Sequence, residues 1–155
     1  MNKIGLDTKK ADEIAGRLNI LLANYQLLYT NTRGFHWNVK GKDFFELHLK
    51  FEEIYNDLQV KIDEVAERIL TLGNAPKNSF SDYLKIASIK EVSNEANGAA
   101  GLQYILDGFI IILKIERELL QLSGEINDEG TNALMSGYIT EHEKSVWMFN
   151  SYLNK

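Results

Sequence analysis

Two histidines and three carboxylates between residues 36 and 67 have the chemistry and the spacing of metal ligands. His48 and Glu52 are four residues apart, and so are Asp63 and Glu67. Residues four apart share one face of an α-helix, so each pair could present two ligands side by side. His36 adds a second imidazole twelve residues before His48. The chain has no cysteine, so the donors are nitrogen and oxygen, which suits iron better than structural zinc or calcium.

The two ligand pairs lie too far apart to bind one ion within a single chain. Fifteen residues separate His48 from Asp63, which at about 1.5 Å per residue is roughly 22 Å along a helix. A second copy of this helix, packed antiparallel about a two-fold axis near Asp57 and Leu58, would bring the first pair of one copy to the second pair of the other. His36 can swing over the same site. The spacing therefore predicts a metal site shared by two subunits.

Four long helical segments should position these ligands. Apolar residues recur at steps of three and four, the period of an amphipathic helix, from Thr8 to about Arg33, from Leu47 to Ile69 and from about Asn97 to Ser123. We expect the last of these three segments to be the most deeply buried. A fourth segment begins near residues 127–129, where a capping residue and two acids suit a helix start, and reaches Tyr152 or Leu153.

A long crossover should join the second and third helices. Gly73 and the only proline, Pro76, end the second helix. The chain from there to about Asn94 can span the bundle, and residues 79–84 could form a short helix across it. Two helical hairpins joined by one crossover are the ferritin-like arrangement of a four-helix bundle. We therefore predict an all-α, ferritin-like four-helix bundle with a short extra helix, formed by residues 1–155 as a single domain.

The ligand segment resembles the signature of the Dps family of mini-ferritins. The shared pattern is His36-Trp37, a glycine in the following turn, His48, a carboxylate four residues later, and Asp-x-x-Ala-Glu-Arg at residues 63–68. The helix pattern extends the resemblance over nearly the whole chain. In contrast, the Glu-x-x-His motifs of an ordinary di-iron centre within one subunit are absent.

The resemblance implies a ferroxidase site made of His36, His48 and Glu52 from one subunit and Asp63 and Glu67 from its partner. It places Trp37 beside that site. It further implies a dodecamer of two-fold dimers around a cavity, oxidation of Fe(II) preferably by hydrogen peroxide rather than oxygen, and storage of the Fe(III) product as mineral. No haem is expected.

Other residues receive weaker interpretations. The resemblance puts Asp128, Glu129 and Glu143 near a pore for iron uptake on a three-fold axis. Trp37 is equally consistent with a buried interface anchor and with a radical sink beside the metal. We assign no metal role to His142, because a single histidine on an amphipathic helix is usually hydrogen-bonded or solvated.

Charge and composition argue against several other functions. A net charge of -5 with interspersed acids should repel a phosphate backbone, and both ends lack the lysine-rich tail of DNA-condensing Dps proteins. The main alternative is therefore a structural nucleoid protein that binds DNA and takes up metal incidentally; a bundle that stops at the dimer is a weaker one. The first residues contain no apolar core of signal-peptide length, and the longest purely aliphatic run, Ile110 to Leu113, is far below membrane-spanning length, so we expect a cytoplasmic protein.

Overall fold

The computed structural model describes residues 1–154, and helices are its only regular elements. They are α1 (Thr8–Asn38), α2 (Phe44–Thr71), α3 (Phe80–Ile86), α4 (Gly98–Glu125) and α5 (Glu129–Tyr152). Within these residues an isolated bridge between Lys40 and Asn97 is the only β-type pairing. The predicted all-α bundle with one short extra helix is confirmed.

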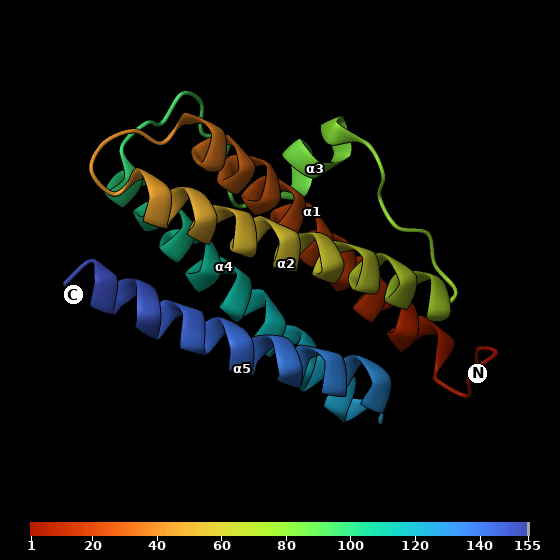
Figure 1. Ribbon diagram of the computed structural model, residues 1–155. Helices are drawn as coiled ribbons and strands as arrows, with labels where there is room; N and C mark the ends of the chain where they lie inside the picture. The colour runs from red at the N-terminus through yellow and green to blue at the C-terminus, as the bar shows by residue number, and fades with distance from the viewer. Residues whose placement is uncertain (155) are drawn as a thin grey trace.

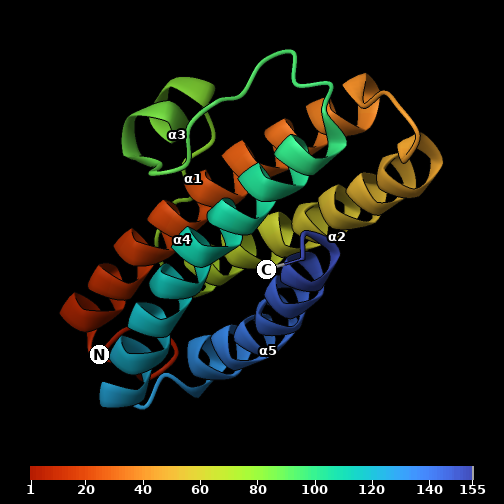
Figure 2. The ribbon, with the colours of Figure 1, turned by 90° about the vertical axis from the view of Figure 1, so that its left-hand side faces the viewer.

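The four long helices run side by side as two antiparallel hairpins, α1 with α2 and α4 with α5 (Figures 1 and 2). Helices α2 and α4 point the same way, so the chain between them returns over the whole bundle and carries α3 across the outside of α1. The closely packed pairs are α1 with α2, α4 and α3, and α4 with α5. Helices α2 and α5 approach less closely, which leaves a groove between them.

Helix α1 is longer than its sequence pattern predicted. The Asp7 side chain caps its start by accepting from the Lys10 amide at 2.9 Å. The helix continues past Arg33 to Asn38, because Gly34 keeps a helical conformation and buried Phe35 extends the apolar face. The turn comes at Gly41, whose φ of 110° favours glycine. His36 and Trp37 thus lie in the last turn of α1.

Helix α2 shows the predicted core stripe. The buried residues of this stripe are Leu47, Phe51, Ile54, Leu58, Val65 and Ile69. Ile62, on the same predicted stripe, is half-buried. The helix ends at Thr71, two residues before Gly73, which has a φ of 93°, and the Asn74 amide donates back to the Ile69 carbonyl at 3.1 Å. The sequence pattern therefore located both the buried face of α2 and its end.

Two buried asparagines on α1 hold the crossover in place. The Asn24 side chain accepts from the Ser88 and Ile89 amides at 3.0 and 2.9 Å. The Asn31 side chain accepts from Val92 and donates to the Lys90 carbonyl at 2.8 Å. These bonds satisfy backbone groups that would otherwise be buried without partners.

The most deeply buried helix is not the one that the sequence predicted. Helix α1, in contact with α2, α3 and α4, is covered on more of its surface than α4, so the prediction that α4 is the most buried helix was wrong. By length and composition alone α4 could cross a membrane. It also carries the buried carboxylate Glu116 and packs on α1 and α5, as the core helix of a bundle does.

Candidate metal centre

The last turn of α1 and the first turns of α2 bring His36 and His48 into contact. Their imidazole rings are stacked, with centroids 3.8 Å apart and planes 14° apart. His36 is buried and His48 is half-buried. Two histidines twelve residues apart in sequence therefore form one unit at the α1–α2 turn.

Two reciprocal hydrogen bonds fix the proton on each ring. His36 Nδ1 donates to the His48 carbonyl at 2.6 Å, and His48 Nδ1 donates to the His36 carbonyl at 2.7 Å. The direction is certain because a carbonyl oxygen can only accept. In the neutral imidazole, a proton on Nδ1 leaves a lone pair on Nε2. Both rings thus present Nε2 as a metal donor, oriented by a backbone contact as metal-binding histidines commonly are.

Neighbouring aromatic rings hold this pair. Phe44 stacks on His48 with centroids 4.9 Å apart, and the edge of Tyr55 meets His36 at 5.3 Å. Such contacts restrict ring rotation and add packing energy beyond area burial. The two Nε2 lone pairs are therefore preorganised.

The three candidate carboxylates are uncommitted. Glu52 is half-buried, Asp63 and Glu67 are exposed, and no side-chain hydrogen bond or ion pair within residues 1–154 engages any of them. Within the same residues, no three His, Asp or Glu side chains are close enough together to hold a metal ion. One subunit thus unites the two imidazoles but not a complete ligand set.

The candidate ligands on α2 are placed symmetrically along the helix. His48 and Glu67 are centred on the midpoint between residues 57 and 58, and Glu52 and Asp63 share that midpoint. Two large apolar side chains, Phe45 and Leu70, share it as well, and they are 85% and 58% exposed. Leu49 and Val60 are also exposed on this helix.

Trp37 lies on the surface next to the histidine pair. Its side chain is 65% exposed. The Arg33 guanidinium lies between two rings, 4.9 Å from the Trp37 centroid and 5.1 Å from that of Tyr29. This cation–π contact orients the indole on the subunit surface.

The pore candidates have different environments. Asp128 is buried and caps α5 by accepting from the Thr131 amide at 3.1 Å, and Arg68 donates to the same oxygen at 2.5 Å. An aspartate committed in this way is a structural link between α2 and α5, which argues against a role for Asp128 in an iron-uptake pore. Glu129 is exposed, and Glu143 is paired with Arg117. The sequence could not show this because Arg68 lies sixty residues away.

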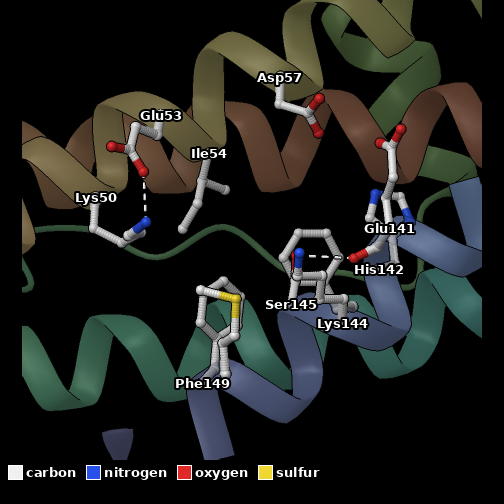
Figure 3. A pocket seen from close by; sticks show the side chains of 11 residues that line it. Lys50, Glu53, Ile54, Asp57, Glu141, His142, Lys144, Ser145 and Phe149 are labelled. Atoms are coloured by element: carbon white, nitrogen blue, oxygen red, sulfur yellow. Dashed lines mark hydrogen bonds and ion pairs between the residues drawn. The ribbon is translucent and has the colours of Figure 1, made fainter.

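A groove of about 290 Å³ lies between α2 and α5, and none of the five candidate ligands lines it (Figure 3). Each of its carboxylates is in an ion pair: Glu53 pairs with Lys50, while Asp57 and Glu141 share buried Lys61, each 2.6 Å from its Nζ. The groove is therefore not an open cation site.

His142, on one wall of this groove, belongs to a buried polar cluster that the sequence analysis missed. Its Nδ1 lies 2.8 Å from Glu116 Oε1, and the Tyr25 hydroxyl donates to the same oxygen at 2.5 Å. The expectation that His142 is hydrogen-bonded is confirmed. A signal was available, since Glu116 lies four residues after Ile112 and three before Leu119 on the apolar stripe of α4.

The fold and the histidine pair define a ferritin-like protein. Residues 15–155 match the family model described as a ferritin-like domain. The crystal structure of a Dps protein from Vibrio cholerae O1, described as a member of a broad superfamily of ferritin-like diiron-carboxylate proteins, superposes with a TM-score of 0.97 at 59% identity, covering 99% of this chain and 96% of that one.

Other relatives narrow the assignment. A DNA protection during starvation protein from Porphyromonas gingivalis is 45% identical over 97% of this chain and 95% of its own. A Dps crystal structure from Bacillus brevis has a TM-score of 0.90 at 33% identity, covering 96% of this chain and 99% of that chain. The chain belongs to the Dps family, a class of iron-binding mini-ferritins.

Proposed function

We propose that this protein is a ferroxidase whose Fe(II) site is shared between two subunits. In each of two equivalent sites, His36, His48 and Glu52 of one subunit meet the partner subunit's Asp63 and the partner subunit's Glu67. The observation that carries the proposal is the histidine pair, because both rings are locked in the tautomer that leaves Nε2 free for a metal.

The symmetry of the α2 face supports the shared site. When two helices pack antiparallel about the midpoint between residues 57 and 58, residue i faces residue 115 minus i of the partner. His48 then faces the partner subunit's Glu67, and Glu52 faces the partner subunit's Asp63. Phe45 faces the partner subunit's Leu70, so that apolar side chains exposed in one subunit become covered.

The stacking favours two ions in each site. A metal ion lies about 2 Å from a ring nitrogen, along a lone pair that is in the ring plane. The planes of His36 and His48 are nearly parallel and 3.8 Å apart at their centroids, so one ion cannot lie in both planes. Two ions, one on each Nε2, therefore suit the stacked rings better than a single shared ion.

Two Fe(II) ions supply the two electrons that hydrogen peroxide needs. The peroxide takes up both electrons and two protons and becomes two water molecules, so that no hydroxyl radical is released. Oxygen is a second possible oxidant. We further propose that the Fe(III) product is stored as mineral inside a dodecamer of these dimers in the cytoplasm, which protects the cell from oxidative damage.

Stopped-flow absorbance on protein mixed with Fe(II) and peroxide tests this function. We expect the double variant His36→Ala/Asp63→Ala to lose rapid oxidation. Glu52→Gln should also be slow, while its matched control Glu53→Gln, which changes the next carboxylate and lies outside the site, should react like the wild type. Oxidation at the wild-type rate by the double variant would refute the proposal.

Assembly is tested separately by light scattering. A particle of twelve 17.7 kDa chains is expected. A species of two chains would support the weaker alternative of a bundle that stops at the dimer, and would contradict storage in a cavity.

The competing function is DNA protection, which the description of the Porphyromonas gingivalis relative names for that protein. The net charge of -5 opposes it. We expect supercoiled plasmid to migrate freely in a gel-shift assay at low salt, where charge-driven binding is strongest. Retardation that disappears as salt is added would favour the DNA-binding alternative.

A further inference from the structure

A buried ammonium group joins α2 to α5 in the groove between these helices. Lys61 Nζ lies 2.6 Å from Asp57 Oδ2 on its own helix and 2.6 Å from Glu141 Oε2 on α5. Figure 3 shows the two carboxylates extending toward each other from the two helices. The Lys61 side chain is 3% exposed, whereas those of Asp57 and Glu141 are 52% and 61% exposed. The two carboxylates are thus open to the groove, and the cation between them is not.

The two carboxylate oxygens are arranged as ligands of a hard cation are. Each lies 2.6 Å from a common point, the Lys61 nitrogen. Ca²⁺ takes carboxylate oxygens at about 2.3–2.6 Å. The ring of Tyr138 is also close to this point, with its centroid 5.3 Å from Nζ. The ammonium therefore occupies a position in which these carboxylates could hold a metal ion.

A further donor lies on the same wall of the groove. His142 is 1% exposed, and its Nδ1 is committed to Glu116 at 2.8 Å. Its Nε2 is buried and makes no hydrogen bond within residues 1–154. No three His, Asp or Glu side chains of these residues converge on one point, so the two carboxylates and water would be the first ligands of an ion. The imidazole nitrogen would be available if the ion drew the wall closer.

Lys61 competes with such an ion from inside the fold. Its ammonium is tethered to α2, so its local concentration at the carboxylates is far above that of a free cation. Burial lowers the pKa of Lys61, but the hydrogen bonds to Asp57 and Glu141 outweigh burial and raise the pKa above 10.5. The competing charge is therefore present throughout the neutral pH range.

We infer that the Lys61 ammonium is a built-in cation that excludes Fe(II) and other hard metal ions from Asp57 and Glu141. Lys61 thereby determines where this protein binds metal. The exclusion itself does not depend on the ferroxidase proposal, because it follows from the contacts of Lys61 alone.

The use of this exclusion rests on the proposed function. Asp57 is nine residues from His48 and six from Asp63, which is roughly 14 and 9 Å along α2. An Fe(II) ion between Asp57 and Glu141 would therefore be a lone ion, outside the shared site. A lone Fe(II) gives peroxide one electron and yields Fe(III), hydroxide and hydroxyl radical. Lys61 would thus keep iron at sites where two ions react together.

Calorimetric titration of the assembled protein with Tb³⁺, a hard ion that prefers oxygen ligands, tests the exclusion. Lys61→Ala should bind one more Tb³⁺ per subunit than the wild type. Lys61→Gln keeps most of the side-chain volume without the charge and should also bind the additional ion, so the test does not depend on the stability of one variant. Folded Lys61→Ala and Lys61→Gln proteins that bind no more Tb³⁺ than the wild type would overturn the inference.

The place of the additional ion is checked by matched variants. Adding Asp57→Asn and Glu141→Gln to Lys61→Ala should abolish it, whereas Lys144→Ala, which removes an exposed lysine from the same groove, should not create it. Tyrosine excitation should sensitise its emission, because the Tyr138 ring is close. Tyr138→Phe in the Lys61→Ala protein should therefore keep the ion and lose the added emission. An additional ion that survives the two carboxylate changes would also contradict the inference.

Spin trapping tests the consequence for iron. Mixed with Fe(II) and peroxide, Lys61→Ala should release several-fold more hydroxyl radical than the wild type, and the added Asp57→Asn and Glu141→Gln changes should restore the low wild-type yield. An unchanged yield in a variant that binds the additional Tb³⁺ would overturn the protective role. Slow Fe(II) oxidation by the wild type would instead refute the ferroxidase proposal, and the Tb³⁺ result would stand.

Discussion

The backbone oxygen of His48 lies 2.6 Å from Nδ1 of His36, and the backbone oxygen of His36 lies 2.7 Å from Nδ1 of His48. Each imidazole is therefore held by the helix that carries the other. The α1–α2 turn cannot open without breaking both bonds, and neither Nε2 can turn away without loss of the bond that its own ring makes. The nitrogen half of the proposed site is complete in one subunit, and the carboxylate half must come largely from a neighbour.

This division predicts complementation between two inactive variants. One variant carries His36→Ala and His48→Ala, and the other carries Asp63→Ala and Glu67→Ala. Each mixed dimer has one site with both halves intact, so random co-assembly in equal amounts should restore about one quarter of the wild-type sites. Rapid Fe(II) oxidation by the separate and mixed samples measures this. If the mixture is as inactive as its components, the sites are not shared across the two-fold.

The capping role of Asp128 predicts a stability effect. Asp128→Ala removes the α5 cap and leaves Arg68 without its carboxylate, so the free energy of unfolding should fall by about 2–4 kcal/mol. Glu129→Ala, at the neighbouring exposed position, should cost less than about 1 kcal/mol. Urea denaturation compares the two, and equal effects would contradict the structural role of Asp128.

Gly98 marks a close approach between α4 and α2. A Cβ atom added there would lie 2.2 Å from Cδ1 of buried Leu47, next to His48. Gly98→Ala should force Leu47 out of its rotamer and lower stability by about 1–3 kcal/mol. The control Gly137→Ala, which meets nothing within 4 Å in mid-helix, should raise stability by about 0.5–1 kcal/mol. Thermal unfolding of both variants checks the prediction, and a neutral Gly98→Ala would show that Leu47 has room to move.

The raised pKa of Lys61 predicts that the stability of the fold depends on pH in the alkaline range. Burial lowers its pKa, but the hydrogen bonds to Asp57 and Glu141 outweigh burial and raise the pKa above the ordinary 10.5. A raised folded pKa means that the stabilisation is complete below 10.5 and is lost as the pH rises through the folded value. The free energy of unfolding of the wild type, measured by denaturant titration at a series of pH values, should therefore fall as the pH rises above 10.5.

Lys61→Met isolates that contribution from the buried tyrosines, which also titrate at high pH. The variant should be less stable by about 1–3 kcal/mol near neutral pH, and the difference from the wild type should shrink as the pH rises through the raised pKa of Lys61. The exposed Lys144→Met, in the same groove, serves as control and should track the wild type. A difference that stays constant with pH would show that the Lys61 ammonium is not the cause.

Much of the fold could be predicted because helical spacing is a local property. The apolar steps from Leu47 to Ile69 identified the face of α2 that is buried, and the same steps put the candidate carboxylates off that face. Gly73 and Pro76 marked the end of α2 for equally local reasons. The end of α1 was missed by five residues because Gly34 was compatible with either a turn or a helix.

The amino-acid sequence by itself determined the helices, the spacing of the five candidate ligands along them and the absence of thiolate chemistry. Only the tertiary structure decided that the two imidazoles stack and lock each other's protons, that Asp128 binds Arg68, and that Tyr25 donates to Glu116. The physical reason is the separation along the chain of the residues that interact. Periodicity along a helix specifies a direction in space, whereas a hydrogen bond also needs the partner that another helix, tens of residues away, brings into that direction.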